Sequence, residues 1–123
     1  MTDIPEPTVV PVRYLVSCLP EGHDDRWLFS IQVEYRGNGL WAVKLRSQTL
    51  GADGTWSFGL RWIESNREPD PSEVDAYDKA QAAWLAEHRF DHDTALRLAR
   101  EHAPRLRYRG YTVADALRET SRG

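Results

Sequence analysis

The sequence predicts an α+β domain, in which an antiparallel meander of about four strands precedes two to three C-terminal helices packed on one face of the sheet. Residues 26–63 alternate apolar and polar side chains, as strands with one buried face do. Turn residues interrupt this stretch twice, and residues 70–118 carry helix-start signals with apolar positions at helical spacing. Strands first and helices after are typical of α+β folds.

The first hairpin is predicted to turn at Gly37, Asn38 and Gly39, because these residues tolerate a positive φ. A three-residue loop at this place fixes the register of the two strands, and a slip by one residue would turn one of them inside out. The expected pairs are Arg36 with Leu40, Tyr35 with Trp41, Val33 with Val43, and Ile31 with Leu45.

The second hairpin is predicted to turn within residues 51–54. Inward residues are odd-numbered before this turn and even-numbered after it, so its loop should hold two or four residues. A four-residue loop pairs Leu45 with Leu60, Val43 with Trp62, and Lys44 with Arg61. The predicted core comprises Trp27, Phe29, Val43, Leu45, Phe58 and Trp84.

Residues 1–11 hold three prolines and little periodicity, which predicts a flexible tail before a single domain over residues 12–123. The first strand is expected over residues 12–19. Its alternation turns Cys18 to the apolar side, so we interpret this cysteine as a buried structural residue rather than a nucleophile. His23 follows in a polar loop and is expected to be solvated.

The first helix is expected to start at Asp70, with Pro71 in the first helical position and Glu73 completing a capping box. It should end at Glu87 or His88. Its inner stripe at helical spacing comprises Val74, Tyr77, Gln81, Trp84, Leu85 and His88. We expect the helices to cover the tryptophan-rich face of the sheet.

The second helix is expected to begin at Asp91 or Asp93 and to stop before Pro104. Its predicted inner face comprises Ala95, Leu98, Ala99 and His102. Residues 105–109 alternate arginine with apolar or aromatic residues, which predicts a short strand. A final helix is predicted over residues 113–118, capped by Thr112.

The composition fits one soluble domain. The chain has 123 residues, which suits a single core. Its one cysteine excludes an internal disulfide and fits a reducing compartment. No apolar run reaches the roughly 20 residues of a membrane span, and the first residues lack the pattern of a signal peptide. We therefore expect a cytoplasmic protein that does not bind a membrane.

Several stretches of the chain are similar to those of small uncharacterised proteins from actinobacteria and their phages. They are VSCLP at 16–20, EYRG at 34–37 with WAV at 41–43, GADGTW at 51–56, HRFD at 88–91 and TVADAL at 112–117. The resemblance covers most of the chain after its first ten residues, and fourteen arginines against two lysines are what a GC-rich genome produces. It implies a bacterial or prophage setting and brings no activity with it.

The densest cluster of potential metal ligands or acid–base groups is His88, Asp91, His92 and Asp93. We interpret the aspartates as helix caps, because Phe90 and Asp91 should break the helix between the two histidines. The chain holds no phosphate loop, no nucleophile elbow and no two-cysteine metal spacing. We therefore expect no metal, no cofactor and no catalytic activity.

The sequence best fits a small non-catalytic binding domain whose partner is another protein or a second copy of the chain. Residues 64–93 carry nine acids and three bases, whereas residues 94–123 carry seven bases and three acids. Segregated charge and several aromatic residues suit a docking domain. Because tyrosine and arginine dominate interface energetics, Tyr108, Tyr111 and the nearby arginines are the first candidates.

Nucleic-acid binding is the alternative hypothesis. A basic sheet face, extended by the strand over residues 105–109, would contact phosphates. Against this, the face lacks the stacking aromatics that RNA-binding sheets use. The full set of candidate binding residues is Lys44, Arg46, Arg61, Arg105, Arg107, Tyr108, Arg109 and Tyr111.

Overall fold

The computed structural model describes residues 3–59, 68 and 70–120. Its main element is an antiparallel five-stranded meander, in which each strand pairs with the next along the chain. The strands are β1 (Arg13–Ser17), β2 (Ser30–Tyr35), β3 (Trp41–Leu45), β4 (Gln48–Leu50) and β5 (Trp56–Ser57).

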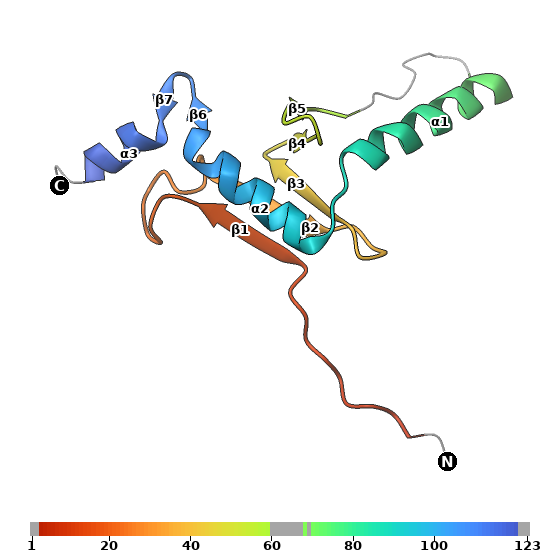
Figure 1. Ribbon diagram of the computed structural model, residues 1–123, viewed down its shortest axis with the longest axis horizontal. Coiled ribbons are helices and arrows are strands. Elements are labelled where there is room, and N and C mark those ends of the chain that lie inside the picture. The colour runs from red at the N-terminus through yellow and green to blue at the C-terminus, as the bar shows by residue number, and fades with distance from the viewer. Residues whose placement is uncertain (1–2, 60–67, 69, 121–123) are drawn as a thin grey trace.

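The helices follow the sheet, so the predicted α+β class is confirmed (Figure 1). The later elements are α1 (Pro71–Glu87), α2 (His92–His102), the 3-10 turn η1 (Ala103–Arg105), β6 (Arg107–Tyr108), β7 (Tyr111–Thr112) and α3 (Val113–Thr120). Strands β6 and β7 form a separate two-stranded sheet. Of the strand predicted over residues 105–109, only Arg107–Tyr108 forms, and it does not extend the main sheet.

The first hairpin has the predicted register. Tyr35 pairs with Trp41, and Val33 pairs with Val43. The Arg36 N–H donates to the Leu40 carbonyl at 2.8 Å, which closes the loop over residues 37–39. All three loop residues have a positive φ, so the Gly-Asn-Gly sequence supplies the conformation that this turn requires.

The predicted second hairpin is wrong, because an additional turn comes first. The chain reverses after Leu45 through Arg46 and Ser47, with Arg46 at φ 54°, and then forms β4. Lys44 therefore pairs with Gln32 on one side and with Thr49 on the other, not with Arg61. The predicted partners Leu60, Arg61 and Trp62 lie outside the described residues.

The extra turn also changes which residues of the next strands face inward. Leu50 is fully buried and pairs with Trp56, so five residues separate them instead of the predicted two or four. Strand β5 then ends at Ser57, and Phe58 is 70% exposed. Phe58 is thus not part of the core, contrary to the prediction.

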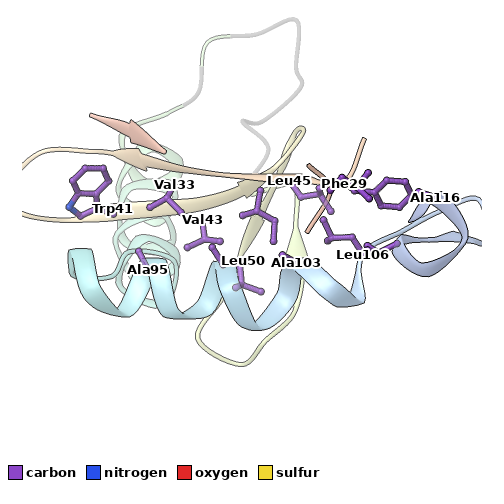
Figure 2. Packing of buried hydrophobic residues seen from close by; sticks show 14 residues of the cluster. Phe29, Val33, Trp41, Val43, Leu45, Leu50, Ala95, Ala103, Leu106 and Ala116 are labelled. Carbon is purple, nitrogen blue, oxygen red and sulfur yellow. The ribbon is translucent and has the colours of Figure 1, made fainter. Parts of the chain in front are cut away.

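The core lies between the sheet and α2, which runs along β1, β2 and β3. Figure 2 shows side chains of the sheet pointing toward this helix. Phe29, Val43 and Leu45 are buried as predicted. Trp27 is 68% exposed, because residues 20–29 form a series of turns and β2 begins only at Ser30.

Strand β1 is shorter than predicted, and Cys18 is exposed rather than buried. Ser17 ends the strand: its hydroxyl donates to the Phe29 carbonyl at 2.8 Å and accepts from the Leu19 N–H at 3.1 Å. This local bend puts Leu19 into the core in place of Cys18.

The predicted N-cap residues begin the helices. Asp70 accepts from the Glu73 N–H at 2.9 Å, and Asp91 accepts from the Thr94 N–H at 2.8 Å. Thr112 and Asp115 cap each other's backbone N–H groups at the start of α3. Helix α2 ends at His102, two residues before Pro104, and its buried face contains Ala95 and Ala99.

Helix α1 departs from the prediction, because none of its residues is buried. It extends away from the sheet in Figure 1 rather than covering it. Its C-terminal end is attached to the sheet region by two contacts: the Ala52 N–H donates to the Glu87 carbonyl at 2.8 Å, and the imidazole of the C-cap residue His88 faces the Ser57 hydroxyl at 3.4 Å. At this end of the helix the Trp84 ring stacks on His88, with ring centres 4.0 Å apart. Trp84 is therefore half-buried at this junction and is not a core residue.

Candidate binding surfaces

Three of the predicted binding residues come together in the structure. The guanidinium groups of Arg46 and Arg109 each lie 5.4 Å from the centre of the Tyr108 ring. Arg46 also donates to the Leu28 carbonyl at 3.1 Å, which fixes its position. We call Arg46, Tyr108 and Arg109 the arginine–tyrosine cluster. It joins the β3–β4 turn to the β6–β7 hairpin.

Both arginines of this cluster occupy turn positions with a positive φ, 54° for Arg46 and 51° for Arg109. Such positions favour glycine or asparagine, so arginine is a costly choice for folding. Within the described part of the chain, neither guanidinium forms an ion pair with a carboxylate. The cluster therefore presents two exposed cations.

The remaining predicted residues are distributed differently. Arg105 and Arg107 are exposed on η1 and β6, beside the cluster in sequence. Lys44 is half-buried on β3. Tyr111 packs against Phe29, with ring centres 5.9 Å apart, and its pKa is raised to about 12, chiefly through its interaction with the Glu119 carboxylate. Tyr111 thus closes the core at this end of the sheet.

The histidines near residue 90 have separate partners. His88 Nδ1 donates to the Trp84 carbonyl at 2.6 Å, so its Nε2 is the acceptor that faces the Ser57 hydroxyl at 3.4 Å. His92 instead contacts Tyr14 at 3.1 Å and Asp93 at 3.0 Å. Among the described residues, no three His, Cys, Asp or Glu side chains are grouped to hold a metal ion.

The sequence predicts a solvated His23, but in the structure its imidazole has two hydrogen-bond partners. Its Nδ1 accepts from the Asp25 N–H at 3.0 Å, which leaves Nε2 to donate to the Ala116 carbonyl at 3.1 Å. The imidazole therefore ties the loop before β2 to α3.

A groove that the sequence did not reveal runs beside β1, the first strand of the meander. The Tyr35 N–H donates to Val12, so the alternating ladder turns the main-chain groups of Tyr14 and Val16 toward β2. Those of Arg13, Leu15 and Ser17 point to the other side, where no described strand pairs with them. We call the space of about 440 Å³ at this edge the β1 groove.

The β1 groove has an apolar wall and a cationic end. Leu96 of α2 and the residues of β1 line it, together with Arg26 and Arg100. Arg26 Nε donates to the Leu19 carbonyl at 3.2 Å, which places this guanidinium beyond the C-terminal end of β1. Neither arginine pairs with a carboxylate of the described chain. The only sequence signal for this groove is the terminal place of β1 in the meander.

A second hollow, of about 390 Å³, lies between the β2–β3 turn and α1. We call it the α1 hollow. Its apolar residues are Leu40, Ala82, Leu85 and Ala86, and its charged residues are Arg36 and Arg89. Burial lowers the pKa of Arg89, and the neighbouring charge of Arg36 lowers it further. Two cations therefore face one largely apolar space.

Comparison of the chain with protein-family models, with curated proteins and with solved structures gives no match. The resemblance to actinobacterial and phage proteins therefore stays a prediction. In the described part of the chain, no helix has the length and apolar character to cross a membrane.

Proposed function

We propose that this protein is a non-catalytic protein-interaction module, which binds an extended segment of a partner protein as an added strand along β1. The observation that best supports this is the β1 groove, where edge main-chain groups, an apolar wall and two arginines without a carboxylate partner in the described chain meet. Strand addition is a common mode of peptide recognition, in which main-chain hydrogen bonds give affinity and side-chain contacts give specificity.

The lining of the groove defines the chemistry of the partner segment. The edge groups of Leu15 and Ser17 supply hydrogen bonds to any extended main chain. Leu96 favours an aliphatic side chain on the α2 side, and Leu15, 46% exposed, favours another on the opposite side. Arg26 and Arg100 favour an aspartate or glutamate near the C-terminal end of β1.

A second copy of the chain fits this groove poorly. Antiparallel pairing of two β1 strands about Leu15 sets Arg13 of one copy opposite Ser17 of the other, near Arg26 and Arg100. This arrangement gathers like charges. It also brings Pro11, which lacks an N–H donor, into the continued ladder. We therefore assign the groove to a different protein, whose bound segment carries an acidic residue.

Selection from a displayed library of random ten-residue peptides tests this proposal. The enriched sequences should carry aliphatic residues on both faces of the added strand, an odd number of positions apart, and should share one acidic position. A synthetic peptide of that sequence should bind Arg100→Ala at least about tenfold more weakly than the parent, because a charge-assisted hydrogen bond is lost. Arg97→Ala, on the same helix but paired with Glu101, is the control and should bind normally.

Enrichment of peptides without an acidic position would contradict the assignment of Arg26 and Arg100. Equal binding by the Arg97→Ala and Arg100→Ala proteins would contradict it as well. A library that yields nothing above the background of the empty support would contradict strand addition itself.

Nucleic-acid binding is the second candidate, and the arginine–tyrosine cluster favours it. Arg46 and Arg109 are held at one ring, with Arg105 and Arg107 close in sequence. Cations without carboxylate partners suit contacts with phosphates, each of which releases about one counterion.

This candidate predicts a steep dependence of nucleic-acid affinity on salt. The logarithm of the association constant should fall linearly with the logarithm of salt concentration, by about 0.9 per phosphate contact on duplex DNA. The double variant Arg46→Asn, Arg109→Asn should lose about two phosphate contacts, which makes this slope shallower by about 0.9 for each contact. Asparagine is chosen because it tolerates the positive φ at both turns. Arg97→Gln is the control. The candidate fails if neither DNA nor RNA binds at low salt.

A further inference from the structure

Residues 3–12 form an extended, wholly exposed segment, which we call the tail. It points away from the sheet in Figure 1. It exposes large aliphatic side chains at Ile4, Val9, Val10 and Val12, and it carries two acids, Asp3 and Glu6. Exposed aliphatic side chains present apolar area to water, which is unfavourable unless a partner covers it.

The prolines favour one backbone conformation of the tail. Pro5, Pro7 and Pro11 favour the polyproline II conformation, which has three residues per turn. In that conformation Asp3 and Glu6 lie on one edge, roughly 9 Å apart, and Ile4 lies on the adjacent edge. The tail therefore presents a pair of carboxylates beside an aliphatic side chain.

The α1 hollow has the complementary pattern. Leu40, Leu85 and two alanines form its apolar part, and Arg36 and Arg89 supply two cations. Glu34 contacts both Arg13 and Arg36, at 3.8 and 3.0 Å, so one carboxylate serves two guanidinium groups. Arg89 is held by its donation to the His88 carbonyl at 2.9 Å and has no carboxylate partner among the described residues.

We infer that the α1 hollow binds the tail of a second copy of the chain, with Asp3 and Glu6 at Arg36 and Arg89 and with Ile4 against Leu40 and Leu85. Each copy then gives a tail and receives one, which makes a two-fold symmetric dimer. This surface shares no lining residue with the β1 groove among the described residues, so the two proposals stand or fall independently.

The tail is better placed to reach a second copy than its own hollow. It leaves the sheet at Val12, whose carbonyl accepts from Tyr35, close to the β2–β3 turn that borders the hollow. Pro11 and Pro7 stiffen the chain next to the sheet. Asp3, nine residues before Val12, therefore lies up to roughly 28 Å from the point where the tail leaves the sheet. Folding back onto its own hollow would need a sharp reversal in this stiff segment.

Charge reversal tests this inference by sedimentation velocity over a range of concentrations. The parent chain of residues 1–123 should form a dimer that dissociates on dilution and with added salt. A tail variant (Asp3→Lys, Glu6→Lys) and a hollow variant (Arg36→Glu, Arg89→Glu) should each dimerise at least about tenfold more weakly. An equal mixture of the two should recover dimers, because both tail–hollow contacts are then complementary again.

A peptide competitor gives a second readout that does not depend on the folding of the hollow variant. An excess of a synthetic peptide of residues 1–12 should convert the parent dimer to monomer, and the same peptide with lysine at positions 3 and 6 should not. The inference is overturned if the parent stays monomeric up to a concentration on the order of 1 mM. It is equally overturned if both variants dimerise like the parent, or if their mixture remains monomeric.

Discussion

Phe29→Ala should lower the free energy of unfolding by about 3–5 kcal/mol. The Phe29 side chain is fully buried in the core (Figure 2), and its ring lies 5.9 Å from that of Tyr111 in the C-terminal hairpin. Removing it leaves a cavity where two parts of the chain meet, so the neighbours cannot collapse without moving the hairpin.

Phe58→Ala is the matched control for this variant. Phe58 is 70% exposed, so its replacement should change the stability by no more than about 0.5 kcal/mol. Urea denaturation followed by tryptophan fluorescence measures both variants. Equal destabilisation by the two substitutions would mean that the inward and outward assignments along the sheet are wrong.

Leu50→Ala should lower the free energy of unfolding by about 2–5 kcal/mol. This variant decides between the register that the sequence predicts and the register of the structure. If β3 continued directly to a turn at residues 51–54, Leu50 would face outward and its loss would cost little. In the structure Leu50 is fully buried on β4, opposite Trp56.

Leu117→Ala serves as the control for Leu50→Ala. Leu117 lies on α3 and is 42% exposed, whereas Leu50 is fully buried. Its replacement should cost under about 1 kcal/mol, since alanine is also a good helix former. A Leu50 variant as stable as the Leu117 variant would contradict the presence of β4.

Local chemistry explains which parts of the fold could be predicted. The Gly37-Asn38-Gly39 loop and the capping residues Asp70 and Asp91 each carry their own signal, and the structure places all of them as expected. The turn at Arg46 and Ser47 carries no such signal, because arginine is an unusual residue at a positive φ. One missed turn then displaced every later pairing in the sheet.

The alternation of side chains also could not show where strands end. Trp27 and Phe58 continue the pattern of β2 and β5 but lie outside both strands and are exposed. Helix α1 has apolar residues at helical spacing, but this spacing does not show whether another element covers them. In the structure, none of the residues of α1 is buried. Burial depends on how the elements dock, which the periodicity of one segment does not encode.

The candidate surfaces depend even more on tertiary structure. Arg46 and Arg109 were both predicted to bind, but their meeting at Tyr108 requires the β3–β4 turn and the docking of the β6–β7 hairpin. The β1 groove joins residues of β1, α2 and the loop before β2, which are far apart in the sequence. No single stretch of the chain could have indicated that combination.

The binding of a selected acidic peptide to Leu15→Pro and Leu15→Ala tests strand addition most directly. Proline at this position removes an N–H that faces the open edge and costs no hydrogen bond to β2, so the fold should persist. Titration calorimetry should show affinity for Leu15→Pro reduced at least about tenfold, and affinity for Leu15→Ala reduced only a few fold. Equal affinities for the two variants would contradict the account, because a strand added to β1 needs that donor.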